Sequence, residues 1–366
     1  MSIREIVRVL EAMAPPALQE SYDNVGLLVG DAQTECTGVL VSLDVTERVI
    51  DEAVEKGCNL IVSHHPILFQ GIKKLTGAHY VERVLLKAIK QDIALYAIHT
   101  NLDNVLTGVS GRMADRLGLV DRRVLEPKED QLYQLSVYVP ATHLSALESA
   151  LYTAGAGNLG QYSECGFVTD GIGGFRPGAG AHPHTGEVGQ RHVGSEKKLE
   201  VVFQSWHKTS VLRAMHEVHP YEEIAYALQQ LENTVSAIGA GVIGRLPAPV
   251  DERVFLQTIK EVFGLQVIRH TPLREKPVQT IALCGGSGQF LTRQAMAAGA
   301  DVYITADIKY HEFFEADGRI LLADIGHYAS EQFTMDLLLE QLRLNFPTFA
   351  LLKTSVDTNP VRIFPG

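Results

Sequence analysis

The stretch that most constrains this chain is a short apolar run that stops abruptly at two histidines and a proline, Asn59-Leu60-Ile61-Val62-Ser63-His64-His65-Pro66. Such a run predicts a buried strand. Neighbouring side chains on a continuing strand point to opposite faces, so both histidines can serve one site only if the strand ends there, and Pro66 ends it. Because open α/β sheets place their sites at the carboxyl ends of their strands, we interpret the pair as part of a metal site.

Strands alternate with helices in the first third of the chain. The predicted elements are a strand over 37–44, a helix from 46 to 53, the strand that begins at 59, a helix over 81–90, a strand over 93–100 and a helix over 110–117. This order predicts an α/β lobe with a mostly parallel sheet. The strands end in polar residues that should meet on one rim: Asp44, then His64 with His65, then His99 with Asp103.

The middle of the chain has a different order of elements. Predicted strands and helices follow one another there as β-α-β-β-α-β, the ferredoxin-like arrangement. A long Pro/Gly/His loop lies inside it and carries His182, His184 and His192, for which a solvated loop is favoured over a metal site. We therefore predict two similar α/β lobes with mostly parallel sheets, over 1–128 and 235–366, interrupted by an inserted α+β ferredoxin-like domain over 129–234.

In the last third of the chain, as in the first, predicted strands end in aspartate and histidine residues. His327 and Glu331 are four residues apart at the start of a predicted helix, so they lie on one face and can bind the same ion. With His64, His65 and Asp103 they make three imidazoles and two carboxylates. This set suits Zn, Mn, Fe, Co or Ni, and a bridging carboxylate would let it hold two divalent metal ions per chain.

Each of these pairs has a simpler interpretation when it is taken alone. His64 and His65 can be hydrogen-bonded residues at a strand end, and His327 with Glu331 can be an exposed helical pair, since such spacings are common by chance. Three His/carboxylate clusters at strand ends favour a shared site. The four cysteines lie far apart without a C-x-x-C pair, so neither a thiolate site nor a disulfide framework is indicated.

Other polar residues near these strand ends are candidates for supporting roles. His99, Asp44 and Asp307 can orient the ligands, and His99, Asp307 and His311 are candidates for moving protons during catalysis. A helix cap and a surface histidine explain Asp307 and His311 equally well. The run Cys284-Gly285-Gly286-Ser287-Gly288 offers amides to an anion, but a tight turn between a strand and a helix is the favoured interpretation.

Composition excludes several classes of protein. A net charge of −11 without any Lys/Arg block argues against bulk nucleic-acid binding. No run approaches the roughly 18 consecutive apolar residues of a membrane span. Because the N-terminus also lacks an apolar signal core, we expect a cytoplasmic protein.

These motifs together resemble the GTP cyclohydrolase 1 type 2 homologue family, also called the nuclear interacting factor three family, in its long bacterial form. The matching stretches are Asp23-Asn24-Val25-Gly26-Leu27, Ser63-His64-His65-Pro66, His99-Thr100-Asn101-Leu102-Asp103, Cys284-Gly285-Gly286-Ser287-Gly288, Thr305-Ala306-Asp307-Ile308-Lys309-Tyr310-His311 and Gly326-His327-Tyr328-Ala329-Ser330-Glu331. Two small departures are Ala306, where the family pattern leads us to expect glycine, and the loop from His182 to His192, which contains more histidines than we expect.

The resemblance implies a dinuclear metal centre between two lobes and assembly into a ring-shaped homohexamer. The family's ligands fall on the five residues already selected, His64, His65, Asp103, His327 and Glu331. The insert resembles trimeric signalling and copper-tolerance proteins, and its His219-Pro220-Tyr221-Glu222-Glu223 run fits that type.

Two functions are compatible with these features. The first is a cyclohydrolase-like, metal-dependent hydrolase of a small anionic or nucleotide-like ligand. In it the metal ions generate a hydroxide that attacks a ring carbon, an amide or a phosphoester. The second is a non-catalytic hexamer that regulates or traffics metal and whose insert senses a ligand. In either case the site needs the first and last thirds of the chain together, so residues 1–128 alone should bind metal weakly.

Overall fold

A computed structural model describes residues 1–364, so the last two residues of the predicted 235–366 lobe lie outside it. The chain divides into two compact units. One comprises residues 1–127 together with 236–366, and the other comprises residues 128–235. None of the helices within residues 1–364 is long and apolar enough to cross a bilayer.

The first sheet of the larger unit has the strand order β1-β4-β3-β2-β15. Its strands are β1 (Gly26–Val29), β2 (Val39–Ser42), β3 (Leu60–Ser63), β4 (Ala94–Ala97) and β15 (Leu351–Lys353). All pairs are parallel except β1 with β4. Every residue of β2, β3 and β4 is buried, as expected for strands covered on both faces.

Helices cover both faces of this sheet. The apolar sides of α2 (Glu47–Glu55) and α3 (Tyr80–Lys90) share one core with β2, β3 and β4. The Thr46 side chain accepts the Val49 amide and so begins α2, and Gly57, with φ +68°, follows its end. A second pair of helices also packs at this sheet. Helix α11 (Thr334–Asn345) contacts β2 and β15, and α1 (Ile3–Met13) contacts α11.

The second sheet has the order β11-β14-β13-β12-β10-β5. Its strands are β5 (Val120–Pro127), β10 (Gly239–Val250), β11 (Arg269–His270), β12 (Val278–Leu283), β13 (Val302–Thr305) and β14 (Leu321–Asp324). Only β12 with β13 and β13 with β14 pair in parallel, so the prediction of a mostly parallel sheet is wrong here. The sheet is mixed largely because β5 and β10, the strands directly before and after the smaller unit in the sequence, form a long antiparallel ladder.

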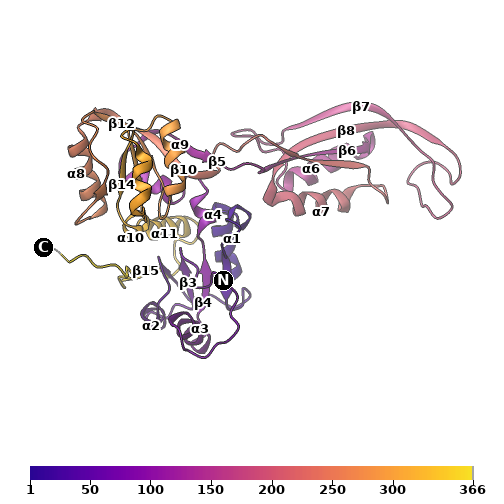
Figure 1. Ribbon diagram of the computed structural model, residues 1–366. Coiled ribbons are helices and arrows are strands. Elements are labelled where there is room, and N and C mark those ends of the chain that lie inside the picture. Colours follow the sequence, from indigo (N-terminus) through magenta and orange to yellow (C-terminus); the bar gives the residue numbers. More distant parts are fainter. Residues whose placement is uncertain (365–366) are drawn as a thin grey trace. The chain divides into compact units, whose positions relative to one another are not determined.

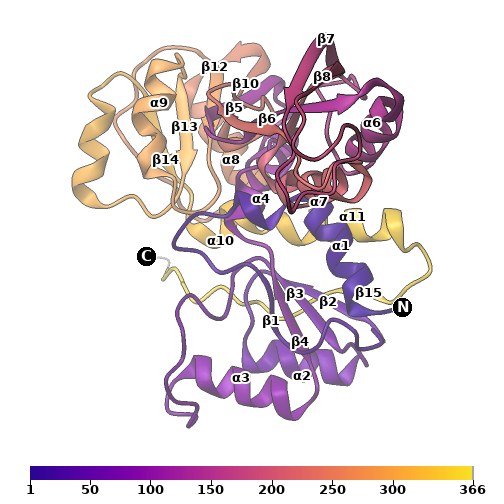
Figure 2. The same cartoon turned by 90° about the vertical axis from the view of Figure 1, so that its right-hand side faces the viewer.

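Besides α1, α2, α3 and α11, the larger unit contains further helices. They are η1 (Pro16–Leu18), α4 (Thr100–Asp103), α5 (Val109–Arg116), α8 (Glu252–Phe263), η4 (Gln289–Leu291), α9 (Thr292–Ala297), η5 (Tyr310–Ala316) and α10 (His327–Glu331). Side chains of α5 and α8 pack on one face of the sheet and those of α9 and η5 on the other. The single helix predicted after His327 is in fact two, α10 and α11. Both lie between the two sheets in Figures 1 and 2.

The two lobes exchange strands at their edges. β5 belongs to the first third of the chain, yet it pairs with β10 of the second sheet. β15 comes from the end of the chain, yet it pairs with β2 of the first. The α/β class predicted from the sequence is confirmed.

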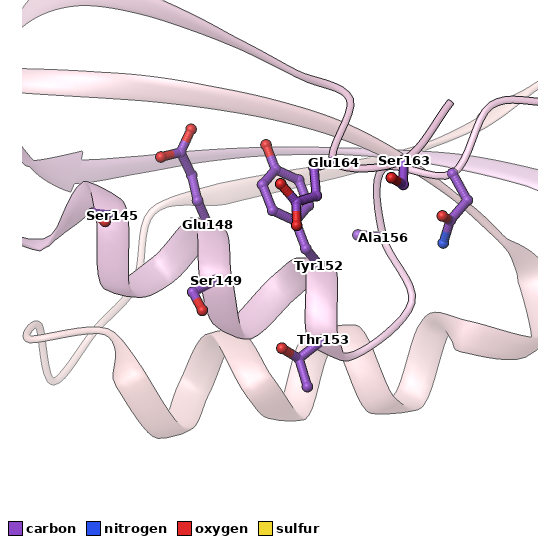
Figure 3. Close-up of a pocket in the computed structure, with 9 residues that line it drawn as sticks. Ser145, Glu148, Ser149, Tyr152, Thr153, Ala156, Ser163 and Glu164 are labelled. Atoms are coloured by element: carbon purple, nitrogen blue, oxygen red, sulfur yellow. The ribbon is translucent and has the colours of Figure 1, made fainter. Parts of the chain in front are cut away.

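The smaller unit has the element order β6 (Leu132–Pro140), η2 (Ala141–His143), α6 (Leu144–Thr153), β7 (Gly166–Phe175), β8 (His192–Gln204), η3 (Ser205–His207), α7 (Lys208–Val218) and β9 (Tyr226–Leu231). Its sheet has the order β7-β8-β6-β9 with every pair antiparallel. Side chains of α6 and α7 form a core with β6 and β8. A cavity of about 460 Å³ lies beside α6, and Figure 3 shows Glu148, Tyr152 and Glu164 among the residues that line it.

The long loop between β7 and β8 folds back onto the smaller unit. The His184 ring contacts those of His143 and Tyr221, and the His192 ring contacts Phe175. His192 is the first residue of β8. The interpretation of His182, His184 and His192 as part of a solvated loop stays a prediction.

Candidate metal centre

Two of the predicted ligands leave the end of β3. The amides of His64 and His65 donate to the carbonyls of Ser42 (3.3 Å) and Leu43 (2.9 Å), so pairing with β2 continues for two residues beyond the strand. The hydroxyl of Ser63 donates to the His65 carbonyl at 2.8 Å and closes the turn before Pro66. Both rings are thereby held at the same rim, with centroids 5.0 Å apart.

Helix α10 brings His327 and Glu331 to this rim. Glu331 Oε2 lies 3.0 Å from His65 Nε2 and 3.1 Å from His327 Nε2, and the two nitrogens are 3.2 Å apart. Within the described residues Oε2 makes no well-aligned hydrogen bond. Tetrahedral ligands at bonds of about 2.0–2.1 Å stand about 3.3 Å apart, so this triangle of donors has the size that a first-row ion requires.

The other Glu331 oxygen faces a second group of donors. Oε1 is 3.7 Å from His64 Nε2, which is itself 3.7 Å from Asp103 Oδ1. These separations are too long for hydrogen bonds. His64 Nε2 and Asp103 Oδ1 are both buried and have no hydrogen-bond partner among residues 1–364. Buried polar atoms are normally paired, so the pair fits a site for a cation.

Four imidazoles present the same nitrogen to the centre because the opposite nitrogen is held. Nδ1 is hydrogen-bonded to a carbonyl or carboxylate oxygen in each case: His64 to Ile98 O (2.8 Å), His65 to Asp44 Oδ1 (2.8 Å), His99 to Asp23 Oδ1 (2.8 Å) and His327 to Asp307 Oδ2 (2.6 Å). An Nδ1–H that donates in this way leaves the Nε2 lone pair for a metal, and such outer partners are typical of metal-binding histidines.

The three candidates for proton transfer are placed differently. The His99 ring lies 5.2 Å from His64 and 5.4 Å from His65, centroid to centroid, and so belongs to the centre. Asp307 orients His327. His311 is exposed, and its ring contacts Tyr310 and Phe314 on η5, so the structure does not bring it to the ligands.

The glycine-rich turn after β12 packs against helix α10 beside Glu331. The amides of Gly285, Gly286 and Gly288 donate to the hydroxyls of Ser110, Ser330 and Thr305. These amides therefore hold the turn itself, which favours the structural interpretation over anion binding. Gly286 has φ +61°, and a Cβ there would stand 2.3 Å from Glu331 Oε1.

Some residues that position the candidate ligands were not predicted from the sequence. From the sequence, Asp23 is known only as part of a stretch that matches the family. In the structure Asp23 holds His99, which lies 76 positions away in the sequence. Gly286 gave a turn signal but no sign that it lies against Glu331. No local spacing rule relates such positions, so only the fold reveals them.

The charges of the centre shift the pKa values of its ligands in opposite directions. Burial lowers the pKa of His65, but Asp44 and Glu331 raise it to about 10. Burial is likewise outweighed at His327, whose pKa rises to about 9 through Glu331 and Asp307. Burial and the Glu331 charge raise the pKa of Asp103 to about 7. Burial alone would raise the pKa of Glu331, but the surrounding histidines hold it well below its usual range.

Metal binding is expected to release about two protons per chain at pH 8. His65 and His327, with pKa values of about 10 and about 9, are protonated in the metal-free protein and must lose a proton to become ligands. Apparent affinity should therefore rise with pH and level off near pH 10. The two protonated rings stabilise the metal-free fold fully below the unfolded pKa of about 6.5, and this contribution is lost as pH rises through the folded values. Calorimetric titration in buffers of different ionisation enthalpy measures the release, and a value of zero would contradict these shifts.

The sequence profile of the Duf34/NIF3 (NGG1p interacting factor 3) family matches residues 1–360. The chain belongs to the Duf34/NIF3 family. A relative in Bacillus subtilis, named GTP cyclohydrolase 1 type 2 homolog, is 38% identical over 330 residues, which cover 90% of this chain and 88% of the relative.

Two solved structures share the fold over the whole chain. The Bacillus cereus protein related to NIF3 superposes with a TM-score of 0.85 at 32% identity, covering 100% of this chain and 99% of that one. A Staphylococcus aureus protein gives a TM-score of 0.78 at 29% identity with the same coverage. The resemblance inferred from the sequence motifs is confirmed.

Proposed function

We propose that this protein holds two divalent first-row ions per chain on His64, His65, Asp103, His327 and Glu331. The observation that carries the proposal is the division of the Glu331 carboxylate, whose Oε1 faces His64 and Asp103 while Oε2 faces His65 and His327. A bridging carboxylate with imidazole on both sides suits Zn, Mn, Fe, Co or Ni. Burial and the nearby carboxylates raise the pKa of the Cys284 thiol to about 12, so a thiolate ligand is disfavoured.

The proposed activity is metal-dependent hydrolysis of a small anionic or nucleotide-like substrate. Bound divalent ions would supply Lewis acidity and lower the pKa of a water molecule. His99 has its Nδ1 held by Asp23, so its Nε2 can accept a proton at the centre and pass it on. The name of the Bacillus subtilis relative, GTP cyclohydrolase 1 type 2 homolog, supports cyclohydrolase-like ring opening as the reaction to test first.

Metal content and turnover test this function together. Protein purified without added metal should contain close to two ions per chain, and His65→Ala should remove at least one of them. His311→Ala is the matched control, because this histidine is exposed and contacts only neighbouring rings among the described interactions. Mn- or Zn-loaded protein is then screened against GTP, cyclic amides and phosphoesters. Turnover that is equal in wild type and His65→Ala would contradict the hydrolase.

The second candidate is a non-catalytic, metal-binding regulatory or trafficking hexamer. The observation that favours it is the separate compact unit at 128–235, whose β-α-β-β-α-β order and β7-β8-β6-β9 antiparallel sheet support an inserted ferredoxin-like domain. Such a unit can bind a small molecule or a partner although none of its residues coordinates the metal. We propose the homohexamer for both functions, and the mass of the purified protein in solution tests it.

Deletion of the smaller unit separates the two functions. Pro127 and Gly239 are direct partners across the β5 and β10 ladder, so an Asn-Gly linker can join Pro127 to Ser236 in place of residues 128–235. Every proposed ligand is retained, and we expect metal content and any hydrolysis to be unchanged. Metal exchange that becomes faster or slower, without turnover in either protein, would favour the regulatory function instead.

A further inference from the structure

The segment after β15 is fixed along the outside of β2 and α2. β15 pairs with β2 in register, and the Thr354 amide extends the ladder by donating to Val41 O at 2.9 Å. The buried Glu52 carboxylate then accepts the Ser355 amide (2.9 Å) and hydroxyl (2.7 Å) and also the Thr354 hydroxyl. Since β2 points at the metal centre, a chain that follows it in parallel is delivered to the same rim.

Thr358 reaches the rim and contacts the residue that holds a metal ligand. Its hydroxyl donates to Asp44 Oδ2 at 2.7 Å, while Asp44 Oδ1 accepts from His65 Nδ1 at 2.8 Å. Within residues 1–364, the Asp44 carboxylate makes these two hydrogen bonds, one with each oxygen. The Asp44 side chain is 32% exposed, so packing alone does not fix it.

One hydrogen bond to His65 does not set the plane of the Asp44 carboxylate. The terminal torsion of aspartate is broad and roughly two-fold, so the group can rotate about its bond to Cβ while Oδ1 stays in contact with the ring. A second hydrogen bond on Oδ2 selects one orientation. His64 differs in this respect, because a backbone carbonyl holds its Nδ1 and needs no further support.

We propose that Thr358 is a positioning residue of the metal centre: it fixes the Asp44 carboxylate, which fixes the His65 ring. The proposal rests on the proposed function, because it concerns the ligand geometry of a bound ion. It makes the affinity of the ion at His65 depend on a hydroxyl that lies 314 positions from Asp44 in the sequence and is delivered by the C-terminal segment.

The test compares Thr358→Val with Thr358→Ser in the full-length protein. Removing the hydroxyl should weaken Co²⁺ affinity about three- to tenfold and change the Co²⁺ absorption spectrum, and serine should restore both. In an Asp44→Ala background, which removes the carboxylate that joins Thr358 to His65, the valine substitution should have no further effect, because the two residues act in series. Thr258→Val is the control, since that hydroxyl bonds only its own helix, at Val254 O (3.0 Å). Unchanged Co²⁺ binding in Thr358→Val, or an equal loss in the Asp44→Ala background, would overturn the proposal.

A metal-free measurement keeps this proposal distinct from the proposed function. The His65 Nδ1–H resonance of the metal-free protein should move in Thr358→Val, stay in place in Thr258→Val and return in Thr358→Ser. If the wild type binds no Co²⁺, the proposed function fails, and this resonance alone decides whether Thr358 positions His65. A resonance that does not move would count against Thr358.

Discussion

Glu331→Gln is expected to abolish metal binding. The carboxylate is 2% exposed and faces donors on both sides, so each proposed ion depends on one of its oxygens. Glutamine keeps the shape of the side chain but replaces one oxygen with an NH₂ group, which cannot bind a cation. Loss of an outer partner alone costs about 10- to 100-fold in metal affinity, so loss of this ligand should exceed about 100-fold. Metal content by mass spectrometry and Co²⁺ titration measure the effect.

The same substitution should also destabilise the metal-free protein. Glu331 is the carboxylate that His65 and His327 share, and removing one partner of a buried ion pair costs about 3–5 kcal/mol. We expect the lower end of this range near neutral pH, because His327 is partly exposed and both rings can release their protons. Glu340→Gln is the control, since Glu340 is exposed on α11 and pairs with Arg112. A Glu331→Gln protein that still holds two ions would contradict the bridging arrangement.

The parts of the centre that could be predicted from the sequence are those set by local geometry. A strand that stops at His64 and His65, and a helical turn that aligns His327 with Glu331, are defined by spacings of one and four residues. Alternating strands and helices similarly predict the α/β class. These patterns depend on backbone periodicity, which each segment carries by itself.

The parts that escaped prediction depend on which segments meet. β15 is a strand of three residues, too short to give a pattern, yet its pairing with β2 brings the C-terminal segment to Asp44. His311 lies away from the candidate ligands for a related reason. Asp307 takes a left-handed conformation, φ +57°, so it turns toward His327 while the chain carries His311 to an exposed position on η5. Proximity in sequence did not predict proximity in space.

Gly286→Ala is expected to remove the metal centre by displacing Glu331. Two effects combine at this position. The backbone is left-handed, with φ +61°, where alanine is strained, and the added Cβ would stand 2.3 Å from Glu331 Oε1 and 3.3 Å from His327 Cε1. The turn has little room to retreat, because the Gly286 amide is bonded to Ser330 Oγ at 2.9 Å. We expect a loss of unfolding free energy of about 2–4 kcal/mol and metal content near zero.

Gly264→Ala separates the backbone strain from the contact with Glu331. Gly264 ends α8 with φ +67°, and none of the described residues has an atom within 4 Å of a Cβ built there. Its substitution should therefore cost only about 1 kcal/mol and leave metal binding intact. Chemical denaturation and metal analysis of both variants give the comparison. If Gly286→Ala retained its ions and were no less stable than Gly264→Ala, the glycine would be needed only for its backbone conformation, and the close approach to Glu331 would have no role in the centre.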